Sequence, residues 1–212
     1  MTKKVKFTNV NKSTFYATLR KRVDEHFEEQ NLSIHANTAM WVKAFFFLGT
    51  FITLYLLILL GNFTPLIMLS LAIFLGVFGA FVGFNICHDA IHKAFSDKPI
   101  VNQIFSFLFS LIGASAYVWS ICHNIVHHTY TNIAGHDEDI DVAPGLIRFS
   151  TEEPVNKIQR YQHIYAFGLY SLAMLSWVFR KDYKKFFQTK IGSQVANHPK
   201  IEYLAMYLHV IA

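Results

Sequence analysis

Five histidines lie in two short clusters within 41 residues of the chain: His88 and His92, then His123, His127 and His128. Residues i and i+4 share one face of a helix, so each cluster contains one pair on a common face. His128 is rotated about 100° from His127 and can therefore face a second metal ion. Imidazole binds iron, copper, zinc and nickel, whereas a structural zinc site closes with four ligands and favours cysteine. We predict that all five histidines are ligands of one dinuclear metal site.

The alternative for these histidines is a set of buried side chains hydrogen-bonded within a helical core. This reading is weaker because each cluster begins where a long uncharged stretch ends, and histidine is costly in lipid. Cys87 and Cys122 each stand directly before the first histidine of a cluster. We predict that both are reduced packing residues rather than metal ligands.

The uncharged stretches indicate a membrane protein. Hydrophobic residues make up 53% of the 212 residues and charged residues only 16%, against about a quarter in a soluble domain. Residues 44–87 contain no Asp, Glu, Lys or Arg. One span needs about 20 apolar residues. We therefore predict two spans, residues 41–60 and 65–86, joined by a tight turn at 61–65.

The basic residues favour one orientation. Eight Lys or Arg residues lie in the first 43 residues, which the positive-inside rule places in the cytoplasm. Two crossings then return the chain to the cytoplasm at His88. The formal net charge is +5. Its membrane-flanking distribution and the lack of nucleic-acid motifs predict no nucleic-acid partner, and we read no signal peptide.

Residues 1–40 are predicted to form a cytoplasmic segment that precedes the main domain, residues 41–212. Phe15, Leu19, Val23 and Phe27 fall four apart, which predicts an amphipathic helix, and Ser13 is a suitable N-cap. Its apolar stripe is expected to lie either on the membrane or on the rest of the protein.

Three later stretches complete the predicted topology. Residues 101–122 are uncharged, but a straight span would place the two clusters on opposite membrane faces. We therefore expect this segment to dip into the membrane or lie along it. Residues 164–179 are short for a span and precede the basic segment 180–190, so we expect an interfacial helix and a cytoplasmic basic segment. An apolar run resumes at Ile201, where we expect a third span, and the chain looks truncated at its C-terminus.

The clusters HDAIH and HNIVHH, continued as TYTNIAGHDEDID, resemble the membrane fatty acid desaturases, and most closely the bacterial front-end, linoleoyl-CoA or acyl-lipid, branch. The resemblance covers the whole chain and is specific in residues 85–141. Trp119, Asn124, Thr131-Asn132 and the run Gly135-x-Asp137-x-Asp139-Ile140 match that branch. It implies an all-α integral membrane fold, in which a transmembrane hairpin is followed by cytoplasmic or interfacial helices that carry the histidines.

The resemblance also implies an activity. Two irons at the cytoplasmic membrane face would use O2 and two electrons to remove two hydrogens from a fatty acyl chain, carried as acyl-CoA or phospholipid. The implied location is a bacterial inner membrane. No catalytic residue is expected apart from the metal ligands. The alternatives are a hydroxylase or ketolase of the same superfamily and a non-catalytic, truncated membrane protein.

Metal-bound histidines usually donate their second N–H to a carboxylate or carbonyl group. Asp89, Asp137 and Asp139 are the candidates for this supporting role, together with Asn124. The alternative for the acidic run 137–141 is a solvated loop. His136 and His163 are weaker candidates for metal ligands. The remaining histidines are not expected to bind metal: His26, His35, His198 and His209.

Two features depart from the family pattern. A third box, Gln- or His-x-x-His-His, is absent from these 212 residues, so five of the family's eight ligands are present and we expect the chain by itself to be inactive. A fused cytochrome b5 domain with His-Pro-Gly-Gly is also absent, since the only His-Pro is followed by Lys200. We therefore expect a separate electron donor, of the ferredoxin or cytochrome b5 type.

Overall fold

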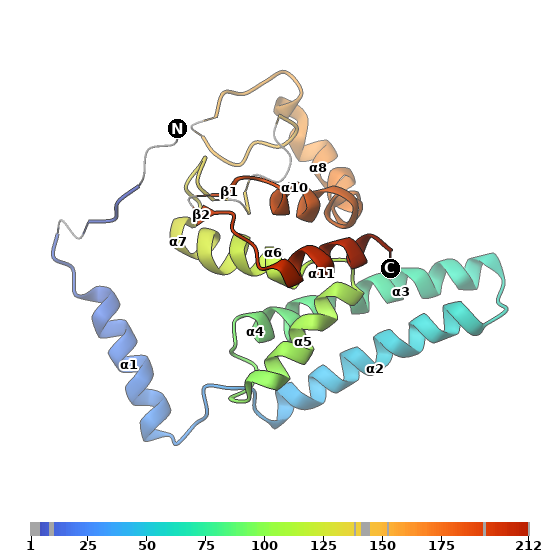
Figure 1. Cartoon of the computed structure of the whole chain (residues 1–212), viewed down its shortest axis with the longest axis horizontal. Coiled ribbons are helices and arrows are strands. Elements are labelled where there is room, and N and C mark those ends of the chain that lie inside the picture. The colour runs from blue at the N-terminus through green and yellow to red at the C-terminus, as the bar shows by residue number, and fades with distance from the viewer. Residues whose placement is uncertain are drawn as a thin grey trace. The chain divides into compact units, whose positions relative to one another are not determined.

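A computed structural model describes residues 5–8, 11–137, 139–140, 145–151, 153–192 and 194–211. The chain divides into two compact units, residues 3–108 and residues 109–212 together with 1–2. The described residues are mostly helical, with two short strands, which confirms the all-α prediction (Figure 1).

The elements up to residue 111 are α1 (Phe15–Glu29), α2 (Thr38–Leu60), α3 (Pro65–Val82), the π-helix η1 (Gly83–Cys87), α4 (His88–Ile91) and α5 (Pro99–Leu111). The later ones are α6 (Ala116–Trp119), the π-helix η2 (Ser120–His127), α7 (His128–Tyr130), the 3-10 helix η3 (Gln159–Tyr161), α8 (Gln162–Ser171), α9 (Ala173–Ser176), the π-helix η4 (Trp177–Lys181), α10 (Asp182–Phe186), β1 (Lys190–Ile191), β2 (Gln194–Val195) and α11 (Lys200–Ile211). The two short strands pair antiparallel and were not predicted.

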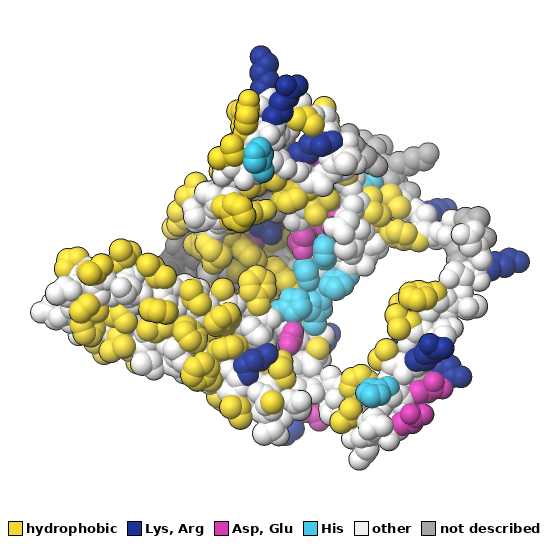
Figure 2. Space-filling view, turned by 180° about the vertical axis from the view of Figure 1, so that it is seen from behind, with side chains coloured by type: hydrophobic (Ala, Val, Ile, Leu, Met, Phe, Trp, Pro, Cys, Tyr) yellow, Lys and Arg dark blue, Asp and Glu magenta, His cyan; other side chains and the backbone are white. Residues whose placement is uncertain are grey.

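The predicted hairpin is formed by α2 and α3, which pack side by side (Figure 1). The Asn37 side chain begins α2 by accepting a hydrogen bond from the Met40 N–H at 3.0 Å, and Pro65 stands in the first turn of α3. The second apolar helix continues through η1 and α4, from Pro65 to Ile91. Both helices are long and apolar enough to cross a membrane, and hydrophobic side chains cover the arm that they form (Figure 2).

The amphipathic helix is also present. Its predicted cap is displaced by one residue, because Thr14 is the N-cap and the Ser13 hydroxyl instead accepts a hydrogen bond from the Phe15 N–H at 3.3 Å. No residue of α1 is buried, and Phe15 and Leu19 of the apolar stripe are 72% and 48% exposed.

The uncharged segment 101–122 is not one straight helix. α5 ends at Leu111, and Gly113 adopts φ +86°, a conformation that glycine reaches without strain, before α6 begins at Ala116. The segment would count as a third membrane-length stretch only if the two broken helices were taken together. Whether it dips into a membrane stays a prediction. Its polar side has a structural use: buried Asn102 accepts from the Ser96 N–H at 3.0 Å and donates to the Ser96 carbonyl at 2.7 Å.

Residues 164–179 are divided among α8, α9 and the start of η4, and the described residues there form no helix of spanning length. Their interfacial position stays a prediction. Within the basic segment that follows, Asp182 and Lys185 are buried, at 2% and 8% exposed. This segment is therefore partly core rather than a uniformly solvated flank. α11 provides 12 described helical residues after Pro199, and a third span there stays a prediction.

Candidate metal centre

The first histidine cluster lies at the end of the second apolar helix. The π-helical turn η1 stands directly before His88, and α4 is capped at its C-terminus by His92, whose N–H donates to the His88 carbonyl at 3.1 Å. The two imidazole rings lie with centroids 4.6 Å apart. The His88 Nδ1 is 3.0 Å from the Asp89 carboxylate. The predicted pair therefore shares a face, and its carboxylate comes from the adjacent residue.

The second cluster lies on the π-helix η2 rather than on an α-helix. In an α-helix, residue i+4 is rotated about 40° past residue i. The i→i+5 hydrogen bonds of a π-helix widen the turn and bring side chains four apart closer to direct superposition. The rings of Trp119, His123 and His127 accordingly form a stack, with centroid separations of 4.1 Å and 4.9 Å.

His128 begins α7 and points in a different direction from its neighbour. Its ring is nearly perpendicular to that of His123, at 89° and 4.8 Å, and it is exposed. The tandem histidines thus present two directions, as the sequence predicts. The structure brings His123, His127 and His128 together within one unit.

Two carboxylates from the following loop hold the stacked histidines. The His123 Nδ1 is 2.6 Å from the Asp139 carboxylate, and the His127 Nδ1 is 2.9 Å and 3.0 Å from the two oxygens of Asp137. A carboxylate at Nδ1 fixes the orientation of the ring and leaves Nε2 as the nitrogen for a metal. Asp89, Asp137 and Asp139 thus each lie beside Nδ1 of a histidine, and their support of metal ligands stays a prediction.

Asp137 organises the loop as well as the histidine. Its carboxylate is buried and also accepts from the Asn132 N–H at 2.7 Å and the Asp139 N–H at 2.9 Å. Burial raises its pKa, but the hydrogen bonds from His127 and the two backbone amides outweigh burial and hold the pKa below its ordinary value. Asn132 and Gly135 have φ of +61° and +74°, the left-handed turns that let the chain return to Asp137. The acidic run is thus not a freely solvated loop at Asp137.

Residues after position 180, which the sequence did not single out, fix the position of η2. α10 packs against α6, where buried Asp182 accepts from the Ser115 N–H at 2.6 Å. β1 packs against η2, and a Cβ added to Gly192 would lie 2.6 Å from the Val126 side chain. Burial lowers the pKa of Lys185 on the same helix, α10. These long-range contacts hold the helix that carries His123 and His127.

Two of the other histidines, His198 and His35, serve the fold. The buried His198 ring uses both nitrogens, since Nε2 donates to the Phe186 carbonyl at 2.8 Å and Nδ1 is 3.0 Å from the Tyr117 hydroxyl. The His35 Nδ1 lies 3.1 Å from the Ala94 carbonyl. His163 is exposed near the start of α8, and the His136 Nδ1 lies 3.4 Å from a backbone carbonyl. The side chain of His209 lies outside the described residues, and the role predicted for Asn124 stays a prediction.

The donor chemistry fits a metal ion. One ligand atom each of His123, His127 and Asp139 lie within 4.8 Å of one another. Because Asp139 faces a ring nitrogen of His123, it is placed as a supporting carboxylate at least as well as a ligand. Both cysteines are buried, and burial raises the pKa of the Cys122 thiol to about 11, which disfavours the thiolate that binds metal. The two histidine clusters belong to different units, so their convergence on one site stays a prediction.

Comparison with known proteins identifies relatives of this chain. The family model for fatty acid desaturases matches residues 63–212, which include both clusters. The chain is 34% identical over 181 residues to the sn-1 linoleoyl-lipid 6-desaturase of Synechocystis sp., covering 82% of this chain and 48% of that protein. It is 29% identical over 201 residues to the acyl-lipid (8-3)-desaturase of Physcomitrium patens, covering 94% and 42%. The chain thus spans about half the length of these curated relatives. No solved structure matches it.

Proposed function

The chain belongs to the fatty acid desaturase family, and from that premise we propose that it forms part of an O2-dependent di-iron acyl desaturase. The proposed ligands are the five predicted ones: His88, His92, His123, His127 and His128. Asp89, Asp137 and Asp139 hold the imidazoles, and Asn124 is a further supporting candidate. When bound, two irons would supply the redox chemistry by which O2 and two electrons remove two hydrogens from an acyl chain.

One observation carries this proposal. Three of the proposed ligands, His88, His123 and His127, each direct Nδ1 to a carboxylate at 2.6–3.0 Å. Core histidines need only hydrogen-bond partners of any kind, as His198 shows with a tyrosine and a carbonyl. These three carboxylate partnerships leave Nε2 of each ring for a metal and raise the basicity of the ring. The chain's own residues thereby orient the ligands and hold Asp137 ionised.

The substrate we propose is a fatty acyl chain carried by a membrane lipid or by CoA. Several relatives are named for acyl-lipid or linoleoyl-lipid desaturation, which favours the lipid-linked carrier. A hydrocarbon substrate is also compatible with two helices that can cross a membrane. We propose a separate ferredoxin or cytochrome b5-type protein as the electron donor.

The remaining metal ligands would come from residues outside these 212, since the sequence contains no Gln- or His-x-x-His-His. On this proposal the 212 residues bind iron without turning over. A non-catalytic membrane protein would instead hold no stoichiometric iron, which metal analysis of the purified chain would show.

Activity is tested by expressing the reading frame that carries these residues in a bacterial host with a compatible electron donor. A new unsaturated fatty acid is expected, and His127→Ala should abolish it because a fixed metal ligand is lost. A hydroxylated product without an alkene would transfer the assignment to the hydroxylase alternative.

We propose that both clusters face the cytoplasm of a bacterial inner membrane. Lys184 reports on this orientation, because it is exposed in α10 while its neighbour Lys185 is buried. A cysteine at Lys184 should react with an impermeant thiol reagent only after cells are opened. The native Cys87 and Cys122 are buried, so background labelling should be low. Labelling of intact cells from outside would contradict the proposed topology.

A further inference from the structure

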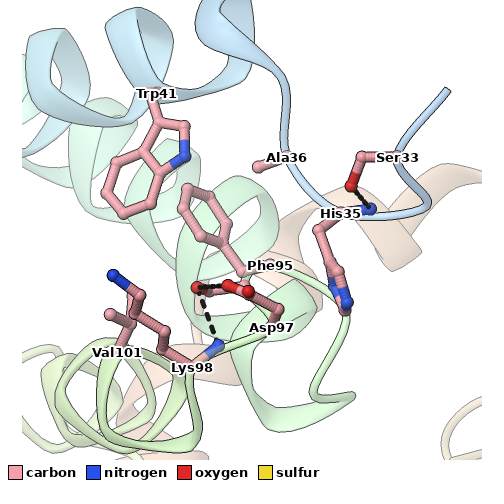
Figure 3. Close-up of a pocket in the computed structure, with 9 residues that line it drawn as sticks. Ser33, His35, Ala36, Trp41, Phe95, Asp97, Lys98 and Val101 are labelled. Atoms are coloured by element: carbon pink, nitrogen blue, oxygen red, sulfur yellow. Dashed lines mark hydrogen bonds between the residues drawn. The ribbon is translucent and has the colours of Figure 1, made fainter. Parts of the chain in front are cut away.

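A cavity of about 370 Å³ lies within the unit of residues 3–108, and none of the five cluster histidines lines it. Its walls come from the segment before α2, the first turn of α2, the loop after α4 and the start of α5. Trp41 and Phe95 lie side by side in it, and Asp97 and Lys98 line the same cavity (Figure 3). Its volume falls within the range of small-ligand pockets, about 300–1,000 Å³.

The position of the cavity along the hairpin points to the membrane surface. Trp41 is the fourth residue of α2, at the end of the hairpin opposite the Gly61 turn. The 23 residues of α2 extend about 34 Å, a little more than the hydrocarbon core of about 30 Å. If α2 crosses a membrane, its first turn and this cavity lie at headgroup depth, where tryptophan is also enriched.

Two side chains of the cavity, Trp41 and Asp97, suit a positively charged amine. The Trp41 ring is half-buried, packs edge-to-face on Phe95 with ring centroids 4.9 Å apart, and has Phe45 stacked on it at 5.7 Å. Tryptophan offers the best aromatic face for a cation. The exposed Asp97 carboxylate lines the same cavity and accepts a hydrogen bond from the Ser96 hydroxyl at 3.3 Å.

Lys98 and the two neighbouring helix starts suit a phosphate. The exposed Lys98 ammonium has no carboxylate within salt-bridge distance among the described residues. The first turns of α2 and α5 each contribute a lining residue, Trp41 and Val101, and neither helix has an acidic residue in its first turn. One N–H at the start of α2, that of Met40, is already bonded to the Asn37 side chain. Helix N-termini carry partial positive charge, so they add to the attraction of Lys98 for an anion.

The cavity walls are held in place before any ligand binds. The Ala36 N–H donates to the Phe95 carbonyl at 3.0 Å, and the His35 ring bonds the Ala94 carbonyl. The Asn102 side chain pairs with both backbone groups of Ser96. Because these bonds fix the two walls, little ordering entropy would be lost on binding.

We propose that this cavity binds the zwitterionic phosphate–amine headgroup of a membrane phospholipid. The amine lies against Trp41 and Asp97, and the phosphate lies against Lys98 and the two helix N-termini. The proposal depends on the membrane position of the hairpin and does not depend on iron or on desaturation.

The test uses the full chain, purified in detergent and freed of lipid, with bound lipid counted by native mass spectrometry. The probes are a short-chain phosphatidylethanolamine and a phosphatidylglycerol with the same acyl chains, which lacks the amine. The unmodified chain should bind the ethanolamine lipid more tightly. Asp97→Asn should weaken only the ethanolamine lipid, and Lys98→Gln should weaken both, each by about tenfold, equivalent to about 1.4 kcal/mol.

Lys93→Gln is the matched control, because Lys93 is an exposed lysine of the same loop that does not line the cavity. It should leave both affinities within twofold. The proposal would be overturned if the unmodified chain bound the two lipids equally, or if neither cavity substitution changed the affinity for either lipid. Competition by soluble glycerophosphoethanolamine should be weak. Competition as strong as that of the lipid would show a soluble ligand instead, and would also overturn the membrane source.

Discussion

The two histidine clusters are held in different ways. In the first, His88 relies on the adjacent Asp89, and both side chains are about one-third exposed, at 35% and 34%. In the second, His127 is held by Asp137 from ten residues further along, and the Asp137 side chain is 0% exposed. In the first cluster the carboxylate comes from the adjacent residue and is exposed to solvent, whereas in the second it comes from a loop that returns to the helix.

This difference shows how rigidity is distributed between the clusters. A water-exposed carboxylate gains little from a single hydrogen bond, because solvent competes for both partners. Asp137 is shielded from solvent and bonded by two backbone amides besides His127, so its position is set before a metal arrives. We infer that the second cluster is the more preorganised of the two.

Removal of a ligand should have the largest effect and should not distinguish the clusters. On the proposed function, His92→Ala and His128→Ala should each abolish desaturation by the active protein, since either removes a proposed metal ligand. His163→Ala is the control, because His163 is exposed at the start of α8, and it should retain activity. Product analysis by gas chromatography measures the outcome. Activity that survives either cluster substitution would remove that histidine from the ligand set.

The supporting carboxylates should separate the clusters. Asp137→Asn should weaken iron binding about 100-fold, and Asp89→Asn about tenfold or less, the two ends of the range for outer carboxylates. The reason is that Asp137, unlike Asp89, is buried and accepts hydrogen bonds from two backbone amides. Iron titration of the purified variants measures both affinities. Equal losses would contradict the inference that the second cluster is the more preorganised.

A smaller effect should follow from the packing behind the second cluster. Gly192→Ala should destabilise the chain by about 1–3 kcal/mol, because the new Cβ meets Val126 at 2.6 Å and φ is +55°. Gly168→Ala, within α8 and with open space around it, should stabilise by about 0.5–1 kcal/mol. Thermal unfolding in detergent compares the two, and equal shifts would argue against close packing of β1 on η2.

The smallest effect concerns pH. The pKa of Asp137 is lowered in the folded chain, whereas an unfolded aspartate titrates near about 3.9. Its stabilisation should therefore be complete above about pH 5 and be lost as pH falls below about 4. The difference in melting temperature between the metal-free chain and Asp137→Asn should stay constant from pH 8 to pH 5 and shrink in acid. If the difference in melting temperature instead grew in acid, the pKa of Asp137 would be raised in the folded chain rather than lowered.

The sequence predicted the features that depend on residue type and short spacing. The uncharged run of residues 44–87 predicted the hairpin. The aspartates that follow His128 were predicted as carboxylate partners for the histidines of the second cluster. The π-helical register of η2 was not predicted, because a shift from i→i+4 to i→i+5 hydrogen bonds leaves the residue pattern almost unchanged. Asp182, Lys185 and Gly192 were also missed. Their roles depend on contacts with residues 115–126, and Lys185 lay within a basic run typical of a solvated flank.

The central claim is that the two clusters bind the same metal centre, and iron content per chain tests it most directly. Two double variants are compared with the unmodified chain after loading with Fe(II) and gel filtration: His88→Ala with His92→Ala, and His123→Ala with His127→Ala. If the clusters share a centre, each double variant should lose all tightly bound iron. If each variant instead retained about half of the iron, the clusters would be separate sites and the account of a shared di-iron centre would be wrong.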